Sequence, residues 1–166
     1  MKRTLKDTAR IKTGLRRRGR EIALSILFQY EASESPSPEE TFNLFCANFG
    51  PSEDADEVLG LDLALFEQAL PFVRDLFFGV ASHQAELDRK IMEASDNWRI
   101  DRMSRVDRNV MRLALFEMLY RKDIPPKVSI NEAIELGKEF GAQDSGAFIN
   151  GILDRIRKQA PAEDVS

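Results

Sequence analysis

The chain has 166 residues, enough to remove about 68–70% of its unfolded surface from water, so its core needs no metal or disulfide. Its single cysteine excludes an intramolecular disulfide, and no apolar run approaches the roughly 18 residues that span a membrane. The N-terminus lacks the apolar core of a secretion signal. We therefore expect a cytoplasmic protein without a membrane segment.

Charge is distributed unevenly along the chain. The first 20 residues contain nine lysines and arginines and one acid, a balance of +8, whereas the whole chain carries −4 and the remainder therefore −12. A basic segment on an acidic body indicates a polyanionic partner such as a nucleic acid. Basic tails are common, however, so this feature alone leaves a solubilising role open.

The first elements follow from local signals. Residues 1–15 are basic and aperiodic and predict a flexible arm. Apolar residues at helical spacing then predict a helix over residues 17–34. Ser37 as N-cap, Pro38 at the first helical position and Glu40, which completes a capping box, mark the start of a second helix.

The middle of the chain predicts a loop and one long helix. Cys46 shares an apolar stripe with three phenylalanines of the second helix, which favours a small buried hydrophobe over a nucleophile. The acidic residues 52–60 predict a loop. A helical pattern follows over residues 61–97, with a kink or restart expected at Pro71. His83 lies at the edge of its inner face, without the Cys or second His that a metal site needs.

Three further helices are expected after the long one. Ser104 is a candidate N-cap for a strongly apolar, central helix over residues 104–121. Ser129 and Glu132 suggest a capping box at the start of the next helix. A last helix is expected over residues 145–158, and a flexible tail from 160 to 166.

No segment shows the alternation of a strand, so the predicted fold class is all-α, a compact bundle of about six or seven helices. The only histidine and the only cysteine fall on different helices. The chain also lacks a glycine-rich phosphate loop and a cluster of metal ligands. We therefore expect no catalytic residues, no metal site and no cofactor.

Four arginines, Arg16, Arg17, Arg18 and Arg20, are the first candidate binding residues. They fall in the first turn of the helix expected from residue 17, where cations oppose the helix macrodipole. A requirement of folding alone would not place them there, although Glu21 partly compensates. Guanidinium groups contact phosphate oxygens bidentately and stack on RNA bases. The alternative is a solvated start to the chain.

The second candidate is the turn and helix start over residues 140–151. A helix N-terminus offers free N–H groups to an anion or a base edge. On a helical wheel Phe148 lies about 40° outside the apolar stripe and shares a face with Arg155, which suits base stacking. Asn150 also lies off the stripe. The alternative is that Asp144 or Ser145 merely caps the helix and Phe148 packs.

Both candidate regions belong to strings that resemble the NusB family of bacterial transcription antitermination factors. Residues 16–24 read RRRGREIAL, like the opening of that family. Residues 127–136 read KVSINEAIEL, and they are followed by FGAQDS at 140–145 and FINGILD at 148–154. The C-terminal strings are long and specific, and the resemblance covers roughly residues 16–158.

The resemblance implies two helical subdomains, here about residues 16–70 and 71–159. It implies binding of boxA RNA from ribosomal operons, jointly with the ribosomal protein NusE, within an RNA polymerase antitermination complex. The implied RNA surface comprises the four arginines and Gln143, Asp144, Ser145, Phe148 and Asn150. The implied NusE surface lies near Phe28 and Asp107, and some relatives self-associate there, so a homodimer is left open.

Two positions depart from the family pattern. Many relatives carry a basic residue where this chain has Ala147, so the resemblance implies one phosphate contact fewer here. Phe28 often corresponds to tyrosine in relatives, so the resemblance implies that this chain lacks a hydroxyl hydrogen bond to the partner. Asp107 also has a structural explanation, because an acid is favourable in the first turn of a helix.

Two other functions remain as alternatives. A helical adaptor that binds only protein would show no salt-dependent RNA affinity. A NusB-like domain also occurs as the RNA-binding part of certain ribosomal RNA methyltransferases, and the chain would then be a fragment of such an enzyme.

Overall fold

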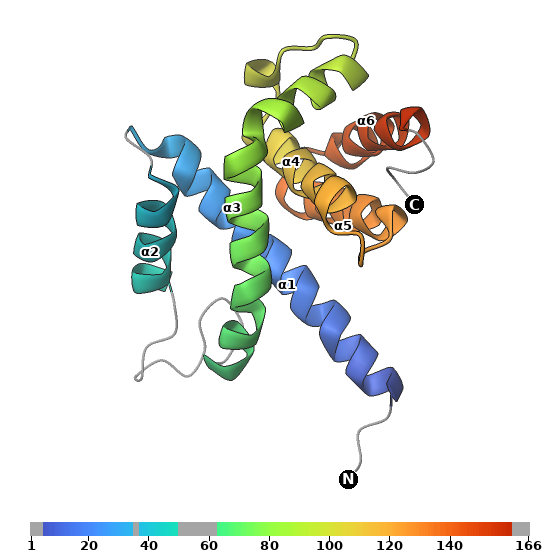
Figure 1. Cartoon of the computed structure of the whole chain (residues 1–166). Helices are drawn as coiled ribbons and strands as arrows, with labels where there is room; N and C mark the ends of the chain where they lie inside the picture. Colours follow the sequence, from blue (N-terminus) through green and yellow to red (C-terminus); the bar gives the residue numbers. More distant parts are fainter. Residues whose placement is uncertain (1–4, 35–36, 50–62, 161–166) are drawn as a thin grey trace. The chain divides into compact units, whose positions relative to one another are not determined.

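A computed structural model describes residues 5–34, 37–49 and 63–160, with side chains for 14–34, 37–48 and 64–160. These residues form six α-helices and one short 3-10 turn (Figure 1). No strand occurs among them, so the prediction of an all-α protein is confirmed. None of the described helices has the length and apolar character needed to cross a membrane. The loop expected over residues 52–60 and the tail beyond Ala160 lie outside the described residues.

The chain divides into two compact units between Phe77 and Phe78, inside helix α3 (Leu63–Ala94). The resemblance placed this division earlier, before Pro71. The first unit contains α1 (Leu5–Ala32), α2 (Pro38–Phe49) and the first half of α3. Its core is built from apolar side chains of all three helices, among them Ile26, Leu27, Phe42, Phe45, Val73 and Phe77.

Helix α1 begins at Leu5, so the expected start near residue 17 is wrong. Residues 5–15 contain no proline, and extending an existing helix by one residue costs far less than starting a new one. The arginine cluster consequently lies in the middle of α1. The argument from an opposed macrodipole therefore does not apply, because that effect is confined to the first turn.

Two of the predicted N-caps are present as expected. The Ser37 hydroxyl accepts a hydrogen bond of 3.4 Å from the amide of Glu40 at the start of α2. At the start of α4 (Arg105–Tyr120) the Ser104 hydroxyl accepts one of 3.0 Å from the amide of Asp107. Each bond satisfies an amide that has no partner within its own helix.

The break expected at Pro71 lies elsewhere in α3. Pro71 is inside the helix, and the described backbone of α3 departs from helical angles at His83 (φ −115°, ψ 15°). The His83 Nδ1 atom lies 2.8 Å from the carbonyl oxygen of Gly79. In a regular helix the amide of residue 83 would bond that carbonyl. The imidazole therefore competes with the backbone for its acceptor, which accounts for the irregularity.

The second unit contains the rest of α3, the 3-10 turn Ile100–Arg102, α4, α5 (Pro126–Phe140) and α6 (Ser145–Gln159). Helix α5 packs against both α4 and α6 (Figure 1). Ten consecutive residues of α4, from Asn109 to Met118, are buried, in agreement with the expected central position of this helix.

Ser129 was expected to cap α5, and this prediction is wrong. The helix begins at Pro126, three residues before Ser129, because a proline in the first turn lacks only an N–H that would have no partner there. Ser129 is buried inside α5 and its hydroxyl donates a 3.0 Å hydrogen bond to Glu117 of α4. Glu132 is also buried within the helix. The polar pattern that resembles a cap thus links two helices instead.

A glycine of α3 sets how closely α4 approaches. A methyl group at Gly79 would overlap the ring of Phe116. We expect Gly79→Ala to lower the free energy of unfolding by about 1–3 kcal/mol, as overpacking does. Gly151→Ala is the matched control, because a methyl group there meets nothing within 4 Å. It should raise stability by up to about 1 kcal/mol through helix propensity. Urea denaturation of both variants measures the contrast, and equal effects would contradict this packing.

Candidate nucleic-acid interface

The arginines expected to bind phosphate differ in exposure. Arg17 is exposed, whereas Arg16 and Arg18 are half-buried. The Arg18 guanidinium donates to the carboxylate of Glu21 at 2.6 Å, and that of Arg16 lies 5.6 Å from the centre of the Phe72 ring. This part of α1 therefore presents a basic face whose side chains are partly oriented by neighbours within the first unit.

Arg20 does not belong to that exposed face. It is only 3% exposed, and its guanidinium lies over the same Phe72 ring, 5.4 Å from the ring centre. A cation held over an aromatic face in a desolvated place contributes to packing. Its expected role as a phosphate contact is therefore not supported by its position. The sequence could not separate Arg20 from its neighbours, because all four arginines look alike in composition.

The second candidate region lies at the start of α6. Gln143, Asp144 and Asn150 are exposed. Asp144 stands at the N-cap position but forms no capping hydrogen bond with its side chain. Ser145 is buried, and its hydroxyl accepts a 2.9 Å hydrogen bond from the amide of Ala142. Ser145 therefore shapes the turn, while the polar groups of Gln143 and Asp144 remain available at the surface.

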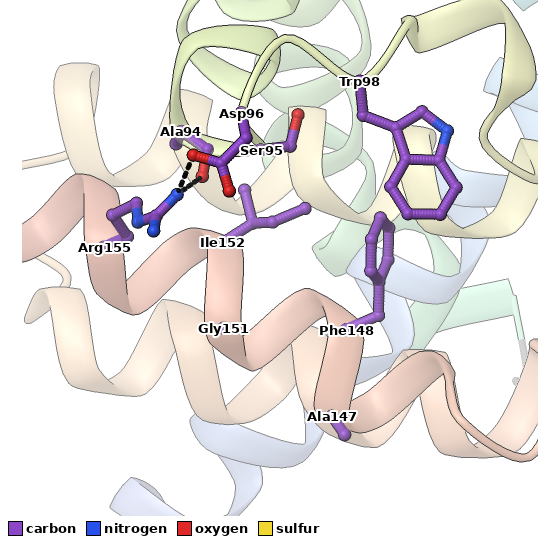
Figure 2. Close-up of a pocket in the computed structure, with 9 residues that line it drawn as sticks. All are labelled: Ala94, Ser95, Asp96, Trp98, Ala147, Phe148, Gly151, Ile152 and Arg155. Carbon is purple, nitrogen blue, oxygen red and sulfur yellow. Dashed lines mark hydrogen bonds and ion pairs between the residues drawn. The ribbon is translucent and has the colours of Figure 1, made fainter.

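Phe148 is half-buried and forms one wall of a surface pocket of about 370 Å³ (Figure 2). Its ring meets that of Trp98 edge to face, with centroids 5.5 Å apart and an interplanar angle of 70°. Trp98 is 52% exposed. Sequence patterns overlooked Trp98, because it follows the end of α3 in an irregular segment. The available signal was that it is the chain's only tryptophan and directly follows the turn-forming pair Asp96-Asn97.

Arg155 lines the opposite end of this pocket. Its guanidinium donates to the carbonyl oxygen of Ala94 at 2.9 Å and to the carboxylate of Asp96 at 3.0 Å (Figure 2). Arg155 and Phe148 therefore border the same pocket, as their shared helix face suggested. The cation of Arg155 is engaged by the end of α3 and supplies one of the carbonyls there with a partner.

The residues expected at the protein-partner surface are both half-buried. Phe28 lies on α1 in the first unit and Asp107 at the start of α4 in the second. One carboxylate oxygen of Asp107 is buried without a hydrogen-bond partner.

Burial raises the pKa of the Cys46 thiol, and the nearby Arg74 lowers it less, which agrees with an inert cysteine.

The predicted site residues thus form two groups. The arginines lie on α1 in the first unit, whereas Gln143, Asp144, Ser145, Phe148 and Asn150 are brought together at the start of α6 in the second. Among the residues with described side chains, no cluster of His, Cys, Asp and Glu could hold a metal ion. Fold and site therefore define a small helical protein with a basic helix face and an aromatic surface pocket.

The comparisons with known proteins identify its family. The NusB family model matches residues 17–158, and the chain belongs to the NusB family. It is 48% identical over 144 residues to the transcription antitermination protein NusB of Desulforapulum autotrophicum, covering 87% of this chain and 92% of that protein. It is 49% identical over 143 residues to that of Myxococcus xanthus, covering 86% and 94%. The expected family and the expectation of a non-enzymatic protein are confirmed.

Solved structures show the same fold. The crystal structure of T. maritima NusB superposes with a TM-score of 0.73 at 37% identity, covering 90% of this chain and 95% of that one. A chain from a crystal structure of the antitermination factors NusB and NusE in complex with double-stranded RNA gives a TM-score of 0.70 at 23% identity, covering 88% and 98%.

The different burial of Arg20 and Arg17 leads to a test. We expect Arg20→Ala to lower the free energy of unfolding by about 1–2 kcal/mol, because it removes a buried side chain and its contact with Phe72. Arg17 lies one helical turn away in α1 but is exposed, so Arg17→Ala should change the free energy of unfolding by no more than about 0.5 kcal/mol. Thermal and urea unfolding measure both variants. If Arg20→Ala leaves the free energy of unfolding unchanged, Arg20 does not contribute to packing and would belong with the exposed arginines.

Proposed function

We propose that this protein is a cytoplasmic, RNA-binding transcription antitermination factor that recognises boxA-like RNA of ribosomal operons together with the ribosomal protein NusE. The observation that carries the proposal is the family match over residues 17–158, which includes Arg17 and Arg18 of the basic face of α1 and the start of α6. The RNA polymerase antitermination complex is the proposed setting in which this pair acts.

The basic face of α1 and the start of α6 contribute differently to RNA binding. Arg16, Arg17 and Arg18 attract phosphate groups, which give affinity without sequence information. The exposed side chains of Gln143, Asp144 and Asn150 can hydrogen-bond base edges, and the ring of Phe148 offers a face for stacking. A structural neighbour of this fold crystallised with NusE and double-stranded RNA, which supports RNA as the ligand class.

The defining experiment is a titration with labelled RNA. A boxA-like single strand, a scrambled strand and a duplex are each titrated with the protein, with and without NusE. The proposal requires the boxA-like single strand to bind more tightly than the scrambled one, and NusE to strengthen that binding. Binding of NusE without any RNA affinity would instead identify a protein adaptor.

Salt dependence tests the role of the basic face. The logarithm of the affinity should fall linearly with the logarithm of salt concentration, and Arg17→Ala should lower that slope by about 0.7, one phosphate contact on single-stranded RNA. Arg89→Ala is the matched control, since Arg89 is an exposed arginine on α3 outside the proposed surface. Filter binding at four salt concentrations measures the slopes. A slope that Arg17→Ala leaves unchanged would exclude Arg17 as a phosphate contact.

Partner binding should be separable from RNA binding. Asp107→Lys places a like charge against the basic surface that the family resemblance assigns to NusE, which costs several kcal/mol at an interface. We expect NusE affinity to fall by at least tenfold, with helical content near that of the wild type, because a charge change in a first helical turn costs about 1 kcal/mol or less. Asp101→Lys is the control, as Asp101 is exposed beside α4. Calorimetry measures the NusE affinity of both variants. If Asp107→Lys binds NusE as tightly as the wild type, the interface does not include Asp107.

A further inference from the structure

The tryptophan beside Phe148 is one of the large hydrophobic side chains that the structure leaves exposed. Trp98 keeps 52% of its surface in contact with solvent, although a buried indole would contribute far more to stability. Its ring and that of Phe148 stand nearly at right angles, 5.5 Å apart, and both line the pocket (Figure 2). Two aromatic rings in this arrangement leave a corner with one flat face and one edge open to a ligand.

We propose that Trp98 and Phe148 together form a pocket for one unpaired RNA base, with Trp98 as an RNA-contacting residue. This inference rests on the proposed function and extends it, because it adds a second aromatic wall to the surface at the start of α6. Bases of single-stranded RNA stack on aromatic side chains whatever their identity, since each base has a π-face. A base held inside a duplex cannot present that face to the pocket.

The chemistry of the other walls suits a base better than a purely apolar ligand. The far end of the pocket is lined by Ala94, Ser95 and Asp96 (Figure 2). The Ser95 hydroxyl donates to the carbonyl of Met92, and the carbonyl of Ala94 accepts from Arg155. The carboxylate of Asp96 is 86% exposed, and one of its oxygens accepts from Arg155. Oxygen acceptors of this kind can receive the N–H groups on a base edge. Aromatic walls for the face and acceptors for the edge therefore occur in one pocket.

The floor of the pocket on α6 is kept small. Gly151 and Ala147 line it, and a methyl group at Gly151 would meet nothing within 4 Å. Glycine weakens a helix interior relative to alanine by about 1 kcal/mol, and no packing contact at this position requires it. The absent side chain leaves room beside the two rings.

Two features hold Trp98 in place. Asp96 and Asn97 adopt left-handed backbone angles (φ 55° and 61°), and the amide of Asn97 bonds the carbonyl of Met92 at 2.8 Å, which ends α3 in a tight turn just before Trp98. Arg155 joins that turn to α6 through Ala94 and Asp96. Arg155 is thus a positioning residue that holds the turn bearing Trp98 against the helix bearing Phe148.

Trp98 is the chain's only tryptophan, so its fluorescence reports directly on the pocket. Titration of the full chain with an unlabelled boxA-like single strand should change that emission, and the same strand as a duplex should not. In parallel titrations with labelled RNA, Trp98→Ala and Phe148→Ala should each weaken binding roughly 5- to 150-fold, the equivalent of losing one base–aromatic stack. Trp98→Phe should recover part of the affinity.

Gly151→Leu tests whether blocking the pocket weakens RNA binding without destabilising the fold. Leucine favours a helix more than glycine, so the melting temperature should stay at or above that of the wild type, while the side chain fills the pocket and lowers RNA affinity at least fivefold. Tyr120→Ala is the control, since Tyr120 is an exposed aromatic of the same unit that does not line the pocket. Its RNA affinity should equal that of the wild type.

The outcomes distinguish this inference from the proposed function. If the wild type binds no RNA, both fail. If it binds the single strand but Trp98 emission does not change, and neither Trp98→Ala nor Gly151→Leu weakens binding, the base pocket is overturned and the proposed function stands. A duplex that changes Trp98 emission as strongly as the single strand would also overturn the assignment to an unpaired base. Should Trp98→Ala unfold, the emission change and Gly151→Leu still decide.

Discussion

A buried ion pair between α3 and α4 determines how the helices of the second unit are joined. Arg112, in the middle of α4, is 4% exposed, and its guanidinium donates to both carboxylate oxygens of Asp88 at 2.6 and 2.9 Å and to Asn109 at 2.9 Å. Removing one partner of such a pair leaves an unmatched buried charge and costs about 3–5 kcal/mol. Because Asp88 lies within two turns of the end of α3, the pair also fixes where the turn that carries Trp98 begins.

A second polar link continues the same pattern from α4 to α5. Glu117 and Ser129 are both buried and share a hydrogen bond of 3.0 Å. Arg155 then ties α6 to the end of α3. The aromatic pocket is lined by the end of α3, the turn that follows it and α6. Specific polar contacts join α3 both to α6 and to α4, and α4 in turn to α5. Apolar packing stabilises these helices, whereas directional bonds specify their register.

The sequence predicted those parts of the fold that depend on neighbours along the chain. Ser37 and Ser104 were recognised as caps because a cap and its amide lie three residues apart. The errors arose where a distant partner decides. Ser129 has the spacing of a cap but bonds Glu117 of another helix, and Arg20 has the composition of a phosphate ligand but is buried against Phe72. Trp98 was overlooked because its pairing with Phe148 joins segments 50 residues apart in sequence.

The cation of Arg155 is already matched by Asp96, so the aromatic pocket adds little net charge to the surface. On the proposed function, attraction between the α1 arginines and phosphate weakens steeply as ions are added, because it depends on counterion release. That attraction also does not depend on base identity, whereas hydrogen bonds to base edges in the pocket and at the start of α6 do. Rising ionic strength would then remove indiscriminate binding first. At higher salt the protein would therefore bind RNA with lower total affinity but with greater selectivity for its sequence.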